Sequence, residues 1–167
     1  MTASLPSMLR ALHASLAANA PEQMVTILQQ SGYGAGEGLF QSFTAANNPS
    51  ELDADLLGDT LSEFFRTGGW GSLTITPIGT GALALDSSDW AEAEPGTAQA
   101  AMCFFSAGML ADFLGRLSDE TIAVMEVECR SKGDERCRFL SATPPVLERV
   151  YNEMTAGRSY AEALGAA

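Results

Sequence analysis

The chain has 167 residues, is 46% hydrophobic and carries a formal net charge of −12 from 21 acidic and 9 basic residues. Its length and composition predict one globular domain over residues 1–167, large enough to bury a sizeable core. The acidic balance argues against binding to nucleic acid, and no apolar run reaches the roughly 18 residues that a membrane-spanning helix needs. The N-terminus lacks the basic and apolar regions of a signal peptide, so a cytoplasmic location is expected.

The first 48 residues are predicted to be helical. Apolar side chains recur at helical spacing near the N-terminus, at Leu5, Leu9, Leu12 and Leu16. A second helix is predicted to start near Pro21 and to continue through the glycine-rich segment 32–38. Because Gly32 and Gly36 are four residues apart and follow a helix rather than a strand, they favour close packing against another helix over phosphate binding.

Residues 49–157 are predicted to form an α+β core. Ser50 and Asp53 resemble a capping box, which would start a third helix. The elements expected after it are a hairpin with strands 70–78 and 82–86, a long helix over 97–117, a second hairpin with strands 121–129 and 136–142, and a last helix over 144–157. We therefore expect an α+β domain, in which two hairpins form an antiparallel sheet that packs against helices.

Three cysteines and one glutamate are the candidate metal ligands: Cys103, Glu126, Cys129 and Cys137. Three thiolates and a carboxylate make a complete tetrahedral set for Zn²⁺, and a closed set is typical of a structural rather than a catalytic ion. The alternatives are three buried thiols or a disulfide between Cys129 and Cys137, although an odd number of cysteines argues against a purely disulfide framework. Spacing alone leaves zinc and these alternatives open.

The choice of carboxylate depends on the shape of the strand. Side chains three residues apart on a regular strand point to opposite faces, as Glu126 and Cys129 would. They can share one ion only if a bulge, a strong twist or the end of the strand lies between them. Glu128 is therefore a competing ligand.

Two segments resemble the 4-vinyl reductase domain family. They are Cys103-Phe-Phe-Ser-Ala-Gly108 and Glu126-Val-Glu-Cys129-Arg-Ser-Lys-Gly133-Asp134-Glu-Arg-Cys137. This family shares its fold with Golgi-transport TRAPP subunits and with bacterial sensors of aromatic compounds. In its metal-binding members Zn²⁺ is held by a Cys, a Glu and two further Cys in this order, so the resemblance implies the same four ligands here. It also implies a homodimer that pairs through the N-terminal helices.

The resemblance also suggests a ligand site. Trp90 lies in a loop that looks like the family's loop leading into the ligand cavity, although it could simply close the edge of the core. Phe105 and Phe113 are candidates for lining an apolar pocket, although aromatic residues at helical spacing are also typical of a core. His13 is the only histidine and is expected to be exposed, without an acid–base partner. No catalytic residue is predicted.

These features together predict a stand-alone module that binds a small hydrophobic or aromatic ligand and holds a structural Zn²⁺. It would act in sensing or would deliver its ligand to a separate effector protein. The alternative is an accessory or carrier protein in bacteriochlorophyll or other tetrapyrrole biosynthesis, which the family name suggests. A third possibility is a pure interaction module, as in the Golgi-transport relatives.

Overall fold

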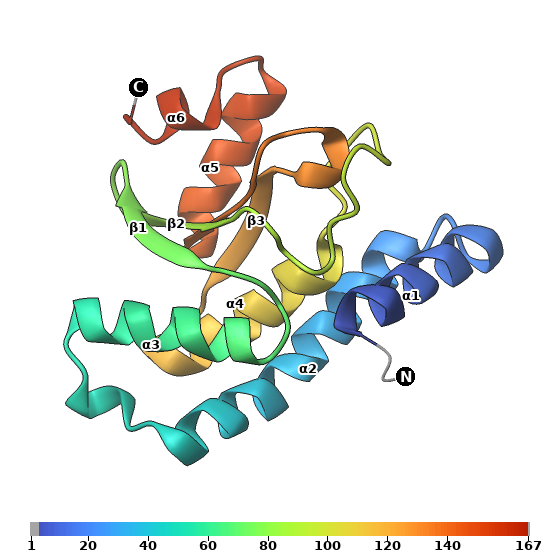
Figure 1. Ribbon diagram of the computed structural model, residues 1–167. Coiled ribbons are helices and arrows are strands. Elements are labelled where there is room, and N and C mark those ends of the chain that lie inside the picture. The colour runs from blue at the N-terminus through green and yellow to red at the C-terminus, as the bar shows by residue number, and fades with distance from the viewer. Residues whose placement is uncertain (1–3, 167) are drawn as a thin grey trace.

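The computed structural model describes residues 4–166 and has the α+β architecture expected from the sequence (Figure 1). Its elements are α1 (Leu5–Asn19), α2 (Met24–Ala46), the 3-10 turn Pro49–Glu51, α3 (Ala54–Thr67), β1 (Thr74–Ile78), β2 (Ala82–Ser87), α4 (Phe104–Ser118), β3 (Ala123–Glu128), the 3-10 turn Arg130–Lys132, β4 (Cys137–Ala142), α5 (Pro144–Thr155) and α6 (Tyr160–Ala163). No helix in this described part of the chain is long and apolar enough to cross a membrane.

The two hairpins join into one four-stranded antiparallel sheet, as predicted. The strand order is β1-β2-β4-β3, so the second strand of each hairpin lies at the centre and pairs with the other. In the central pair, Leu85 of β2 lies opposite Phe139 of β4. The first strands of the hairpins, β1 and β3, form the two edges.

Helices cover both faces of the sheet (Figure 1). On one face, Leu85 and Phe139 pack into the larger core, which α1 to α4 complete. On the other face, Leu140 packs with Leu147 and Val150 of α5. This division follows from the alternation of side chains along a strand, which sends Phe139 and Leu140 to opposite sides.

The predicted close contact between helices is formed by α2 and α4. A Cβ atom at Gly32 would overlap the backbone carbonyl of Phe105, and one at Gly36 would lie 2.5 Å from a carboxylate oxygen of Asp112. On the opposing helix, a Cβ atom at Gly108 would overlap the backbone of α2 at Gln29. These glycines therefore let the two helix backbones touch.

The long helix begins at Phe104 and not at residue 97, so this part of the prediction was wrong. The residues before it bond to the turn of the second hairpin instead of winding into a helix. Gly96 donates its N–H to the carbonyl of Arg130, and Ala98 donates to that of Ser131. Cys103, expected within the helix, occupies the N-cap position of α4.

Three smaller differences concern the ends of elements. The cap of α3 is Asp53, whose carboxylate accepts from Leu56 N–H at 2.9 Å, whereas Ser50 belongs to the preceding 3-10 turn. Strand β1 begins at Thr74 because the preceding loop contains Gly69 and Gly71, both with positive φ. The short helix α6 had no counterpart in the prediction.

Candidate functional site

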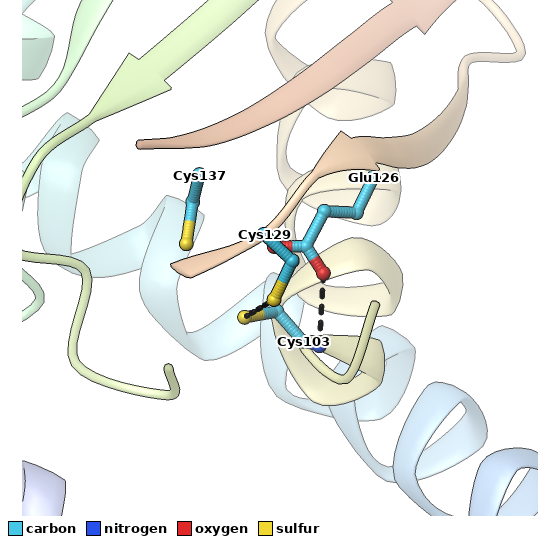
Figure 2. A group of neighbouring side chains, drawn as sticks. All are labelled: Cys103, Glu126, Cys129 and Cys137. Atoms are coloured by element: carbon cyan, nitrogen blue, oxygen red, sulfur yellow. Dashed lines mark hydrogen bonds between the residues drawn. The ribbon is translucent and has the colours of Figure 1, made fainter. Parts of the chain in front are cut away.

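The four predicted metal ligands converge at the start of α4 (Figure 2). Cys103 caps the helix, Glu126 lies in β3, Cys129 follows that strand, and Cys137 is the first residue of β4. Their ligand atoms all lie within 4.8 Å of one another. All three cysteines are buried and are free thiols, with the Sγ atoms of Cys103 and Cys129 4.0 Å apart.

A β-bulge brings Glu126 and Cys129 to the same side. Glu126 pairs with Phe139, and Glu128 pairs with the adjacent Arg138, so β3 has one extra residue, Val127, at this point. Val127 turns toward the core beneath α5. The bulge therefore provides the irregularity that a shared ion requires.

The same bulge turns Glu128 away from the cysteines. Its Oε2 atom accepts hydrogen bonds from Arg136 Nη2 at 3.0 Å and from the Tyr160 hydroxyl at 2.6 Å. Arg138 is bound by Asp86 through two 2.7 Å hydrogen bonds in the same network. Geometry thus distinguishes the two carboxylates, and Glu126 is the one that faces the thiols.

The Glu126 carboxyl is poorly satisfied in its buried site. Oε2 accepts from Cys103 N–H at 3.0 Å, whereas Oε1 is buried and has no hydrogen-bond partner among the described residues. Burial raises the pKa of Glu126 to about 8. An unpaired buried oxygen beside three thiols is the environment that a bound cation would satisfy, so these residues fit a metal.

The thiols differ in how readily they ionise. Hydrogen bonds from the Cys103 and Cys137 thiols lower the pKa of Cys129. Its hydrogen bond to Cys129 raises the pKa of Cys103. In the absence of a metal, negative charge therefore settles first on Cys129, at the centre of the thiol cluster.

The loop between Cys129 and Cys137 is fixed from within. The Asp134 carboxylate accepts from Cys129 N–H at 2.8 Å and lies 3.3 Å from the Lys132 ammonium. Gly133 has a φ of 105°, which favours glycine and lets the chain reverse after the 3-10 turn. The Gly-Asp part of the motif thus holds the turn that brings the two cysteines together.

Glu92 is a further residue of this site that the sequence did not reveal. Its side chain is fully buried and accepts from the N–H groups of Phe105 at 3.0 Å and Ser106 at 2.7 Å, both in the first turn of α4. A carboxylate is favourable there, where N–H groups lack partners within the helix. Glu92 is remote from the helix in sequence, so no local pattern could identify it as a cap.

His13 contacts this buried carboxylate, and the expectation of an exposed, unpartnered histidine was wrong. Its Nε2 atom lies 2.8 Å from Oε1 of Glu92, and its side chain is only 16% exposed. The physical reason is that the histidine face of α1 packs against the loop that carries Glu92. Arg10, one turn earlier, pairs with Glu94 at 3.2 Å.

The predicted ligand-binding residues lie in one connected aromatic cluster. Trp90 is 1% exposed and donates its indole N–H to the Ser106 hydroxyl at 2.7 Å. Trp70 stacks between Trp90 and Phe105, with ring centroids 5.5 and 6.1 Å away. Phe113 is fully buried and joins the cluster through Phe65. Their role in ligand binding stays a prediction.

Comparisons with known proteins match the segment that holds the site. The family model of the vinyl-4-reductase domain matches residues 89–142, and among curated protein sequences none matches the chain. One similar solved structure is the phenol-responsive sensory domain of the transcription activator PoxR, solved with phenol. It is 16% identical, with a TM-score of 0.70, over 95% of this chain and 83% of that one.

A second structure is a vinyl-4-reductase family protein from Methanocaldococcus jannaschii. It is 18% identical, with a TM-score of 0.41, over 84% of this chain and 95% of that one. The PoxR likeness shows the fold, and the segment matched by the family model includes Trp90 and all four candidate metal ligands. The resemblance of this chain to the 4-vinyl reductase domain family is therefore confirmed.

Proposed function

We propose that the chain is a binding module for a small hydrophobic or aromatic molecule, which it senses or delivers to a separate effector protein. The observation that carries this proposal is the fold, shared over 95% of the chain with a domain described as phenol-responsive and solved with phenol. We further propose that it acts in the cytoplasm, where a reducing environment keeps thiols such as these unoxidised.

We propose that Cys103, Glu126, Cys129 and Cys137 hold a structural Zn²⁺. Three thiol groups and one carboxyl group form a closed donor set, and the unsatisfied Oε1 atom of Glu126 needs a positive partner. Such an ion would neutralise the thiolates and would link the start of α4 to both strands of the second hairpin. It would leave no position for catalytic water.

We propose that the ligand binds beside Trp90, Phe105 and Phe113. The indole of Trp90 offers an apolar ring and one N–H donor, which is suited to an aromatic molecule with a hydroxyl group. In the described structure Ser106 accepts that N–H, and Trp70 covers the ring. Binding would therefore require a ligand oxygen to replace the serine hydroxyl and the rings to move apart.

We propose that two copies pair through their N-terminal helices. Met8 is 53% exposed and Leu12 37% exposed on α1, and Val25 is 41% exposed on α2. Burying such side chains between two copies is favourable, and two-fold dimers are the commonest assembly. Light scattering should report a dimer at roughly tens of micromolar, and Leu12→Glu should convert it to a monomer. A parent chain that is monomeric under these conditions would contradict the dimer.

Titration with phenol tests the ligand proposal. Phenol should change the intrinsic tryptophan fluorescence of the zinc-loaded protein in a saturable way. Trp90→Phe keeps a ring but loses the N–H donor, and we expect about tenfold weaker binding, the equivalent of one hydrogen bond. Ser72→Ala is a control on the nearby loop, outside the aromatic cluster. Equal phenol affinity in the parent and the Trp90 variant would contradict this site.

A further inference from the structure

A second apolar site lies away from Trp90, between α3, the sheet and the C-terminal end of α4. It is an open pocket of about 420 Å³. Its walls are mainly aliphatic and include Leu57, Leu61, Ile75, Leu83, Leu85 and Leu117. The Trp90, Phe105 and Phe113 side chains do not line it.

The pocket arises because the helices stop short of this end of the sheet. Leu85 and Leu83 of β2 are two residues apart, so both point to the face that carries the larger core. Leu85 is 1% exposed beneath that core, whereas Leu83 remains 39% exposed. Leu83 therefore forms an uncovered apolar wall beyond the point where the core closes.

The lining selects an uncharged occupant. Of the described residues that line the pocket, Asp55 is the one that carries a charge, and its negative charge disfavours carboxylates, sulfonates and phosphates. Ser118 already donates its hydroxyl to the Leu114 carbonyl at 2.8 Å. Ser141 on β4, which is 4% exposed, is the remaining hydroxyl of the lining.

The size of the pocket bounds the ligand further. Small-molecule pockets generally measure about 300–1,000 Å³, and a dry cavity of about 150 Å³ lined by aliphatic residues already holds a benzene molecule. A pocket of about 420 Å³ therefore has room for more than one ring even though one side is open.

We propose that this pocket is a binding site for a neutral apolar molecule of about two rings, or for a hydrocarbon chain of similar bulk. The inference rests on the proposed small-molecule-binding function and assigns it a second location. Leu61 and Leu85 belong to the same core cluster as Trp90, so occupation of the pocket is in contact with the core that holds the aromatic residues.

Two fluorescent probes with the same ring system test the proposal in the full chain. N-phenyl-1-naphthylamine is neutral, and 1-anilinonaphthalene-8-sulfonate adds one negative charge. We expect the neutral probe to bind saturably and about tenfold more tightly than the sulfonate. Equal affinities, or tighter binding of the sulfonate, would overturn the assignment of a neutral ligand.

A matched pair of variants locates the probe. Leu83→Trp fills the pocket from its exposed wall and should weaken binding of the neutral probe at least about tenfold. Leu56→Trp is the control, because Leu56 is 50% exposed on α3 and does not line the pocket. Since both changes are at exposed positions, both variants should fold, which circular dichroism would verify.

The outcomes separate this inference from the proposed function. Loss of probe binding in Leu83→Trp alone supports the pocket. Full binding in Leu83→Trp, with loss in Trp90→Phe, overturns the pocket but leaves the proposed function intact. If neither the neutral probe nor phenol binds the parent chain, the proposed function and the pocket both fail.

Discussion

His13 of α1 lies 2.8 Å from Glu92, and the carboxylate of Glu92 holds the first turn of α4 through the N–H groups of Phe105 and Ser106. Ser106 also donates its hydroxyl to Glu92 while accepting the indole N–H of Trp90. One buried carboxylate thus connects the N-terminal helix, the start of α4 and the aromatic cluster. Cys103 caps the same helix end, so Glu92 also steadies the candidate metal centre.

Glu92→Gln should destabilise the fold. The amide keeps the shape of the side chain but leaves a buried oxygen position unable to accept from α4, so we expect a loss of about 2 kcal/mol in the free energy of unfolding. The control is Glu94→Gln, which disrupts only the exposed pair with Arg10 and should cost less than about 0.5 kcal/mol. Chemical denaturation measures both, and equal losses would contradict the capping role of Glu92.

The glycines of α2 should respond in opposite directions to alanine. Gly32→Ala places a methyl group onto the backbone of α4 and should destabilise the protein by about 1–3 kcal/mol. A Cβ atom at Gly34 meets no other described atom within 4 Å, so Gly34→Ala should stabilise α2 by about 1 kcal/mol. Thermal unfolding of the two variants checks the prediction, which a stabilising Gly32→Ala would refute.

The sequence was informative where local rules decide the structure. Apolar periodicity located the helices, and the turn between Cys129 and Cys137 predicted the second hairpin. It could not locate the start of α4, because Gly96 and Ala98 bond to carbonyl groups of a turn that is distant in sequence. The contact between His13 and Glu92 was equally hidden, since periodicity does not say which distant loop packs on a helix.

The metal ligands show the same limit at the level of one residue. The spacing of Glu126 and Cys129 signalled that a regular strand would separate them, and so identified the question. The answer depends on the bulge at Val127, which turns Glu128 toward Tyr160 instead of the cysteines. Pairing register is a property of the folded sheet and is not encoded in the alternation of a single strand.

Tyr160 should give the fold a dependence on alkaline pH. Burial, followed by donation to Glu128, raises the pKa of Tyr160 above its ordinary value of 10.0. Folding therefore favours the neutral phenol, so its stabilising contribution is fully present below pH 10.0 and is lost as the pH rises through the folded-state pKa. The free-energy difference between the parent and Tyr160→Phe should thus shrink between about pH 8 and about pH 11.

The absorbance difference between the parent and Tyr160→Phe isolates this titration from the other tyrosines. It should change at a higher pH in the folded protein than in denaturant. A midpoint that is the same in both states would show that burial and Glu128 do not protect the phenol.

Metal content should distinguish the two carboxylates of β3. We expect one zinc per chain in the parent protein, measured by elemental analysis after removal of loosely bound ions. Glu126→Gln replaces a ligand carboxylate with a neutral amide and should lower zinc affinity by about tenfold to a hundredfold. Glu128→Gln is the matched control, because its carboxylate points toward Arg136 and Tyr160 and should leave zinc content unchanged.

Cys137→Ser should remove most of the zinc, because a serine hydroxyl is a far poorer ligand than a thiolate. Competition with a chelator ranks the variants, and we expect the order parent, Glu128→Gln, Glu126→Gln and Cys137→Ser from tightest to weakest, with the first two equal. Thermal midpoints should follow the same order, because a structural ion stabilises the fold in proportion to its affinity. A folded parent protein with three reactive thiols and no metal would contradict the zinc assignment, whereas loss of zinc in Glu128→Gln alone would contradict the choice of Glu126.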